Sequence, residues 1–125
     1  MKINVKPQHT DDRGEITDLL VGQSIDAITR ITFSKDAVRA NHYHKQTIQW
    51  TLVVSGSLLY VSSKVGQDRS QKETLLKGDL VVSEPNEAHS FRALEESEIL
   101  VFTKGPRAGF DYEKDTFRLE VPLIR

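Results

Sequence analysis

The chain consists of short runs of β-prone residues that turn residues separate at close and regular intervals. Clear examples are residues 48–54, which end just before Gly56, and residues 97–103. Glycine, proline and aspartate mark the turns, and no long segment repeats apolar residues at helical spacing. Roughly nine short strands of this kind predict an all-β fold, an antiparallel sandwich or barrel whose natural form is a double-sheet jelly roll.

Individual runs carry more specific expectations. Residues 57–63 should pair with the preceding strand across a tight turn at Gly56. Residues 15–21 have the composition of a half-buried strand, and residues 118–121 that of a final strand. One helical turn is expected near residues 111–115, within an otherwise irregular tail.

Length and composition limit the classes of protein to consider. A chain of 125 residues is most simply one domain, residues 1–125, that can bury a core without disulfides. It has no cysteine, so thiolate metal sites and cysteine nucleophiles are excluded. Seventeen basic residues against eighteen acidic ones form no basic block, which argues against nucleic acid as a partner. No signal-like or membrane-spanning run occurs, so we expect a cytoplasmic protein without a membrane partner.

Three histidines and one glutamine form the candidate site. His42 and His44 lie one residue apart, so on an extended strand both side chains point to the same side. Gln49 follows five residues later, and His89 lies downstream in a similar setting. We expect these four polar side chains to converge in one cavity.

Two chemistries suit such a cluster. Imidazole nitrogens and an amide oxygen can hold one divalent transition metal, such as Zn, Ni, Fe or Mn. Without a metal, a histidine can move a proton as general base and acid. The residue types alone do not decide between metal binding and proton transfer.

The order and spacing of these residues resemble the two sequence motifs of the cupin superfamily, whose jelly-roll barrel agrees with the predicted strands. The resemblance is carried, in chain order, by His42, His44, Gln49, Gly56, Gly78, Pro85 and His89. Gln49 stands where most metal-binding cupins have glutamate, and Glu87 stands where the second motif has glycine.

Further motifs are similar to the dTDP-sugar 3,4-ketoisomerases of bacterial polysaccharide pathways, which are related to sugar 3,5-epimerases and also carry glutamine at the position of Gln49. The spacing from Arg39 to His42, the turn at residues 12–14 and the late segment Phe110–Tyr112 occur in the same order. The family carries tyrosines in the strand before the motif, where this chain has residues 31–33, Ile, Thr and Phe.

This resemblance implies roles for individual residues. His42 would be the base that removes the proton beside the sugar ketone, and His44 would assist it. Arg39 would hold a phosphate or the developing enolate oxygen, and Arg13 would pair with the pyrophosphate. Together with Gln49 and His89, these arginines would bind the substrate. Simple surface ion pairs are an equally good explanation for both arginines.

The leading hypothesis is therefore an isomerase or epimerase that acts on a sugar nucleotide or related keto sugar without a required cofactor. One alternative is a mononuclear metal cupin, a dioxygenase or metal-dependent isomerase, with His42, His44, Gln49 and His89 as ligands. Another is a sugar-binding module without catalysis. A homodimer is expected because jelly rolls leave sheet edges that a second copy can cover, with Trp50 in the core or at that interface.

Overall fold

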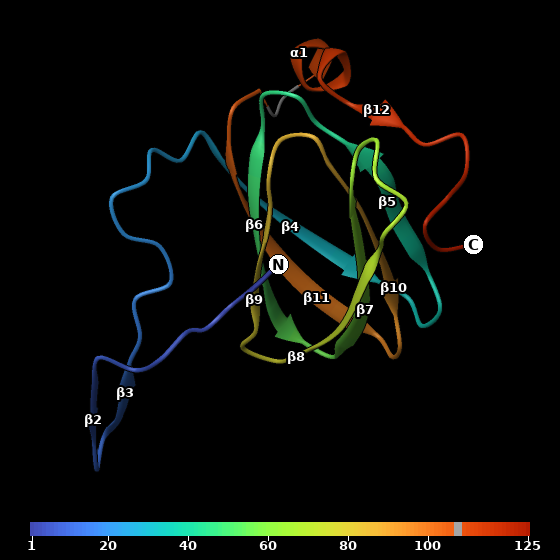
Figure 1. Cartoon of the computed structure of the whole chain (residues 1–125). Coiled ribbons are helices and arrows are strands. Elements are labelled where there is room, and N and C mark those ends of the chain that lie inside the picture. Colours follow the sequence, from blue (N-terminus) through green and yellow to red (C-terminus); the bar gives the residue numbers. More distant parts are fainter. Residues whose placement is uncertain (107–108) are drawn as a thin grey trace.

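The protein is an antiparallel jelly-roll sandwich of two five-stranded sheets, which confirms the fold class predicted from the sequence (Figure 1). The computed structural model describes residues 1–106 and 109–125, and the side chain of Phe110, which belongs to the late segment that resembles the ketoisomerases, lies outside this description. The first sheet contains, in spatial order, β1 (Lys2–Ile3), β9 (Leu80–Ser83), β6 (Ile48–Ser55), β11 (Ser97–Lys104) and β4 (Ala27–Phe33). The second contains β12 (Phe117–Arg118), β5 (Val38–Tyr43), β10 (Glu87–Ala93), β7 (Ser57–Lys64) and β8 (Gln71–Leu76).

The expected pairing across Gly56 is wrong, because β6 and β7 belong to different sheets. β7 pairs with β8 and β10, while β6 pairs with β9 and β11. Gly56 has φ of 84°, and a Cβ there would lie 2.2 Å from Ser97 Oγ and 2.4 Å from the Glu96 carbonyl oxygen. The single glycine therefore carries the chain from one sheet to the other at a point where no side chain fits.

The core lies between the inner faces of the two sheets. It is an apolar cluster that includes Phe33, Val53, Leu58, Tyr60, Leu75, Val81, Phe91, Ile99 and Val101. Strand alternation explains the selection: on β4, Ile31 and Phe33 point inward while Arg30 and Thr32 are exposed. Trp50 is buried but is not part of this inner cluster, in keeping with its position opposite to Gln49 on β6.

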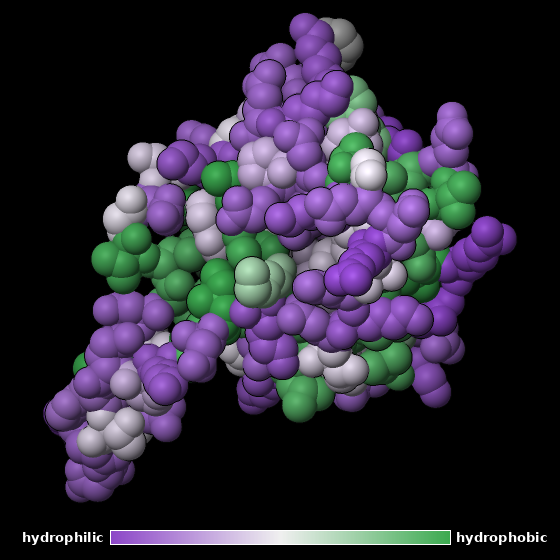
Figure 2. Space-filling model, viewed as in Figure 1, coloured by the Kyte–Doolittle hydropathy of each residue, from purple (hydrophilic) through white to green (hydrophobic). Residues whose placement is uncertain are grey.

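The N-terminal arm, residues 8–22, differs from the expectation. It forms a hairpin of β2 (His9–Asp11) and β3 (Gly14–Ile16), and β3 is exposed along its whole length. The prediction of a half-buried strand over residues 15–21 is therefore wrong: the strand ends at Ile16, and among the described residues β2 and β3 pair only with each other. Figures 1 and 2 show the arm standing clear of the sandwich, with a mainly hydrophilic surface.

The C-terminal segment crosses one end of the sandwich. It contains α1 (Gly109–Lys114), which overlaps the predicted helical turn, followed by β12. The final strand was predicted over residues 118–121, and this range is wrong. The strand β12 pairs with β5 only through Phe117 and Arg118, and Val121 is exposed. Within the described residues, no helix has the length and apolar character needed to cross a membrane.

Candidate functional site

A β-bulge in β5 prepares the site. Ala40 lies opposite Ser90 and His42 opposite His89, so Asn41 is an extra residue between two consecutive positions of β10. Ala40 and Asn41 both have positive φ, 76° and 57°. In a regular strand, Arg39 and His42 would point to opposite faces, because they are three residues apart. The bulge instead brings both of them to the lining of one cavity.

The structure brings His42, His44 and His89 together. The ring centroid of His42 lies 4.8 Å from that of His44 and 4.8 Å from that of His89, and the last two are 5.7 Å apart. One nitrogen from each ring lies within 4.8 Å of the others. His42 is on β5, His44 directly follows that strand, and His89 is on the adjacent β10.

Backbone carbonyls set the hydrogen positions of two of these rings. Nδ1 of His44 lies 2.8 Å from the Asp115 carbonyl oxygen, and Nδ1 of His89 lies 3.1 Å from that of Glu87. A carbonyl oxygen only accepts, so each Nδ1 donates its hydrogen and each neutral ring keeps a lone pair on Nε2. Nε2 of His44 is buried and has no hydrogen-bond partner among the described residues.

Burial keeps His42 and His89 uncharged near neutral pH. It lowers the pKa of His42 to about 3, with smaller contributions from His89 and His44. Burial likewise lowers the pKa of His89 to about 4, although the hydrogen bond to the Glu87 carbonyl acts in the opposite direction. Both rings are therefore neutral at pH 7, with lone pairs available for a proton or a metal.

The histidines border a cavity of about 190 Å³ between the sheets. Its lining combines apolar and polar side chains: Ile31, Phe33, Arg39, Ala40, His42, Gln49, Thr51, His89, Phe91, Ile99, Val101 and Tyr112. Gln49 is therefore in the same cavity as His42 and His89, while the buried His44 lies beside them. The Arg39 guanidinium lies over the Phe33 ring, 5.4 Å from its centroid, and donates to the Thr32 carbonyl oxygen.

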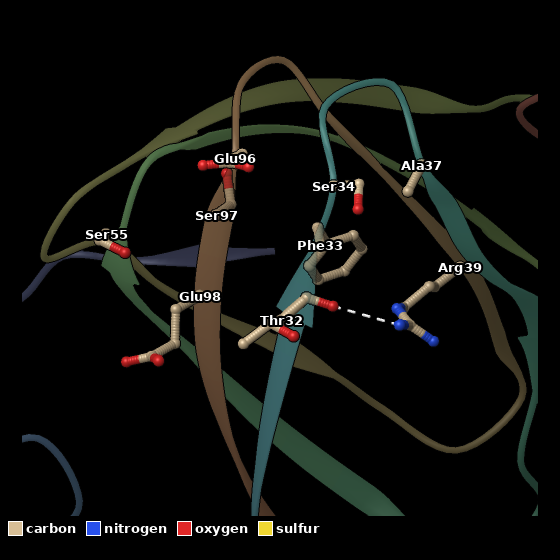
Figure 3. Close-up of a pocket in the computed structure, with 9 residues that line it drawn as sticks. All are labelled: Thr32, Phe33, Ser34, Ala37, Arg39, Ser55, Glu96, Ser97 and Glu98. Carbon is tan, nitrogen blue, oxygen red and sulfur yellow. Dashed lines mark hydrogen bonds between the residues drawn. The ribbon is translucent and has the colours of Figure 1, made fainter.

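Figure 3 shows the lining of a second, more open cavity of about 530 Å³. It adjoins the first cavity, with which it shares Phe33 and Arg39. Its wall is mostly hydroxyl and carboxylate groups, from Thr32, Ser34, Ser55, Glu96, Ser97 and Glu98. Arg30 donates to Glu98 from Nε at 2.7 Å. Arg39 is thus the basic side chain at the junction of the two cavities.

Arg13 lies elsewhere. It occupies the turn of the N-terminal arm and donates through Nε to Asp11 Oδ2 at 3.2 Å, with a second bond from its NH2 group. Hydrogen bonds from Arg13 and His9 lower the pKa of Asp11 to about 2. The arm projects away from the sandwich, so the chain does not bring its own Arg13 to the histidines (Figure 1).

Two residues at the site had no role in the sequence interpretation. Tyr112 lines the cavity and its ring lies 5.4 Å from the His44 ring, and Asp115 binds both His44 and the turn after it. Both come from the C-terminal segment, some seventy positions from His44, and no local pattern links them to the histidines. The one sequence signal was for Tyr112: its segment, Phe110–Tyr112, occurs in the same order as in the ketoisomerases that the chain resembles.

Comparison of the sequence with protein families matches the Cupin family profile over residues 20–109. No protein of curated function matches the sequence.

Comparison of the structure finds related folds at low sequence identity. The sugar 3,4-ketoisomerase QdtA from Thermoanaerobacterium thermosaccharolyticum, in complex with TDP, has a TM-score of 0.77 at 20% identity, over 96% of this chain and 88% of that one. A QdtA variant is described with TDP-4-keto-6-deoxyglucose. The dTDP-4-dehydrorhamnose 3,5-epimerase from Sulfolobus tokodaii has a TM-score of 0.69 at 22% identity, over 86% of this chain and 70% of that one.

The capsular polysaccharide assembling protein CapF from Staphylococcus aureus contains a similar fold within a longer chain. Its TM-score is 0.67 at 21% identity, over 95% of this chain but only 33% of CapF. Identities this low establish a shared fold and leave the chemistry to the residues of the site.

Proposed function

Since the chain belongs to the cupin family, with a profile match over most of its length, we propose that it isomerises or epimerises a nucleotide-linked keto sugar by proton transfer beside the carbonyl. The observation that carries the proposal is that the β-bulge brings a neutral His42 and the cationic Arg39 into the lining of one cavity. Removing a proton next to a carbonyl requires a base and a group that stabilises the enolate oxygen. The TDP-bound neighbours QdtA and its variant support this substrate class.

His42 is the proposed base. Its ring is neutral at pH 7, so it can accept a proton, but burial lowers its pKa and makes the charged ring unfavourable. A bound diphosphate would add negative charge near the ring and raise this pKa toward the range that proton transfer needs. Once protonated, His42 can donate to the Nε2 lone pairs that His44 and His89 keep.

The two cavities suggest how an elongated substrate would lie. The sugar fits the inner cavity of about 190 Å³, and the nucleoside would extend into the outer one of about 530 Å³. Arg39 at the junction would bind the diphosphate or the enolate oxygen. Glu96 and Glu98 repel phosphate but accept hydrogen bonds from a nucleobase, so they favour this orientation over the reverse.

The test is exchange of solvent deuterium into TDP-4-keto-6-deoxyglucose, followed by proton NMR with chelator-treated protein. We expect loss of the signal beside the ketone with the native protein and with His9→Gln, whose histidine lies in the arm. We expect exchange to be slower by about 10²- to 10⁴-fold with His42→Gln. If calorimetry detects no binding of the sugar nucleotide and no deuterium exchanges into it, the proposal is refuted. Binding without exchange would favour a sugar-binding module.

A metal site is the second candidate, and one observation favours it. The buried Nε2 of His44 has no partner among the described residues, and it faces two further neutral rings. Nδ1–H groups held by carbonyls are the usual way in which metal-binding histidines are oriented. His42, His44, His89 and Gln49 would hold Zn, Ni, Fe or Mn, and the bound ion would polarise a carbonyl as a Lewis acid.

Elemental analysis of the purified protein separates these two candidates. A metal centre predicts close to one metal per chain, lost in His42→Ala, and exchange activity that the chelator abolishes. Only traces of metal, with the same content in His42→Ala, would rule it out.

A homodimer and a cytoplasmic location remain predictions. The exposed Ile16 and Val21 on the arm, and Ile28 on the outer face of β4, are surfaces that a second copy could cover. Light scattering coupled to size-exclusion chromatography distinguishes a dimer from a monomer of 14.2 kDa.

A further inference from the structure

Asp115 is a buried acidic residue that follows α1, and its carboxylate holds the connection between β5 and β6. The carboxylate oxygens accept hydrogen bonds from the backbone N–H groups of Lys45 at 2.9 Å, Gln46 at 3.1 Å and Thr47 at 3.0 Å. Thr47 Oγ1 donates a further bond at 2.7 Å. Asp115 is 5% exposed and Thr47 is fully buried, so the two bonds from Thr47 are shielded from water, whereas those from Lys45 and Gln46 are only partly buried. One side chain thus satisfies three consecutive N–H groups directly after His44.

The backbone of the same residue holds His44 itself. The Asp115 carbonyl oxygen accepts the Nδ1 hydrogen of His44 at 2.8 Å. This bond places the lone pair on Nε2, in a ring that lies beside those of the other two histidines. The carboxylate and the carbonyl of Asp115 therefore act together: one fixes the turn that carries His44, and the other fixes its hydrogen.

The C-terminal segment has a second, separate attachment to the sandwich. The Asn41 side chain accepts from the N–H groups of Leu123 at 2.8 Å and Ile124 at 3.2 Å, and donates to the Ile124 carbonyl oxygen at 2.9 Å. The Leu119 N–H donates to the Asn41 carbonyl oxygen. Because this attachment does not involve Asp115, the segment stays docked when the Asp115 carboxylate is removed.

We propose that Asp115 is a positioning residue, which holds His44 in the Nδ1–H form so that its Nε2 serves as the acceptor beside His42. This inference rests on the proposed function of the histidine cavity. Without the carboxylate, three backbone N–H groups lose their partner, the turn relaxes and the carbonyl moves away from Nδ1. His44 then places hydrogen on Nε2 in part of the molecules and presents a donor where a protonated His42 needs an acceptor.

The experiment reads the tautomer directly, by long-range proton–nitrogen NMR of the imidazole rings in protein without substrate. We expect His44 to be in the Nδ1–H form in the native protein, and to show a large share of the Nε2–H form in Asp115→Ala. Asp115→Asn keeps one acceptor oxygen and should give an intermediate result. A merely structural residue would change the unfolding midpoint without changing the tautomer.

Asp79→Ala is the matched control. Its carboxylate also accepts a turn N–H, from Leu76 at 2.8 Å, but between β8 and β9 at the end of the sandwich away from α1 (Figure 1). It should lose stability and keep the native tautomer of His44. If Asp115→Ala does not fold, Thr47→Val removes one donor to the carboxylate and should give a smaller shift of the same sign. An unchanged His44 tautomer in the folded Asp115→Ala or Thr47→Val protein, or an equal change in Asp79→Ala, overturns the proposal.

Turnover gives the second readout. We expect Asp115→Ala to lower kcat for proton exchange about 10- to 100-fold, the range found when a partner that orients a functional histidine is removed, with KM changed less than threefold. If the native protein exchanges no proton with any keto sugar, the proposed function fails while the tautomer result still decides the role of Asp115. If exchange occurs but Asp115→Ala leaves kcat unchanged, the positioning role fails alone.

Discussion

The histidine cavity and the N-terminal arm both contain residues that the sequence marked as functional, but the protein holds them very differently. His44 and His89 are 1% and 2% exposed, and backbone carbonyls fix both rings. The side chain of Arg13 is 83% exposed and bonds only with its neighbour Asp11 among the contacts of the described residues. Tertiary contacts preorganise the cavity, whereas the hydrogen bonds of the arm between described residues are local. Substitutions in the two regions should therefore have unlike consequences.

The largest difference is expected in catalysis. His42→Gln should lower the rate of proton exchange about 10²- to 10⁴-fold, the usual contribution of a general base. Arg13→Gln leaves every cavity side chain in place and should lower kcat less than threefold. Single-turnover NMR or mass spectrometry of deuterium uptake measures both. A comparable loss of kcat in the two variants would contradict the distinction between cavity and arm.

Glycine substitutions test the same contrast in stability. Gly56→Ala should lower the free energy of unfolding by roughly 2–6 kcal/mol, since it combines backbone strain with a Cβ driven into Ser97 and a carbonyl oxygen. Gly14→Ala in the arm has φ of 130° but open space around the added carbon, so only the strain of about 1–3 kcal/mol applies.

Urea titrations of the two glycine variants give the comparison. Similar midpoints would mean that the arm is packed against something in solution, a second copy being the first candidate.

The two arginines offer a binding test. Arg39→Gln should weaken TDP binding about 10- to 100-fold, because charge-assisted hydrogen bonds contribute about 1.5–3 kcal/mol each. Arg13→Gln should weaken it less, since Arg13 lies outside the cavity of its own chain. Calorimetry with TDP measures both affinities. An effect of Arg13→Gln as large as that of Arg39→Gln would place the arm at a nucleotide site in the assembled protein.

A further test of the buried histidines is the pH dependence of stability. His42 and His89 have pKa values of about 3 and about 4 in the folded protein, below the ordinary value of 6.5 that applies on unfolding. Below pH 6.5 the unfolded chain therefore binds more protons, and the free energy of unfolding decreases as pH falls toward 4. The slope should be roughly 1–2 kcal/mol per pH unit for the two rings together.

Urea unfolding at pH 7.5, 6 and 5 measures this slope. The double variant His42→Gln, His89→Gln should have a flatter profile, and an unchanged slope would show that neither ring is buried neutral in solution.

Sequence reasoning succeeded where one spacing rule sufficed. Alternation along a strand predicted that His42 and His44 share a side, and the turn residues predicted most of the strands. Sequence reasoning failed where a local pattern is compatible with two different structures. The residues around Gly56 suit a hairpin, but contact with Ser97 and Glu96 sends the chain to the other sheet. Residues 15–21 suit a half-buried strand, but the strand ends at Ile16, and both Ile16 and Val21 are exposed.

By itself, the sequence determined an all-β jelly roll, the cupin motifs and the identity of the three histidines, because strand periodicity and turn residues act over a few positions. Tertiary structure decided the rest. The pairing of β5 with β10 produced the bulge that brings Arg39 and His42 to one cavity, and the docked C-terminal segment supplied Asp115 and Tyr112. These depend on contacts between residues some fifty to seventy positions apart, and such contacts are settled by packing rather than by any local pattern.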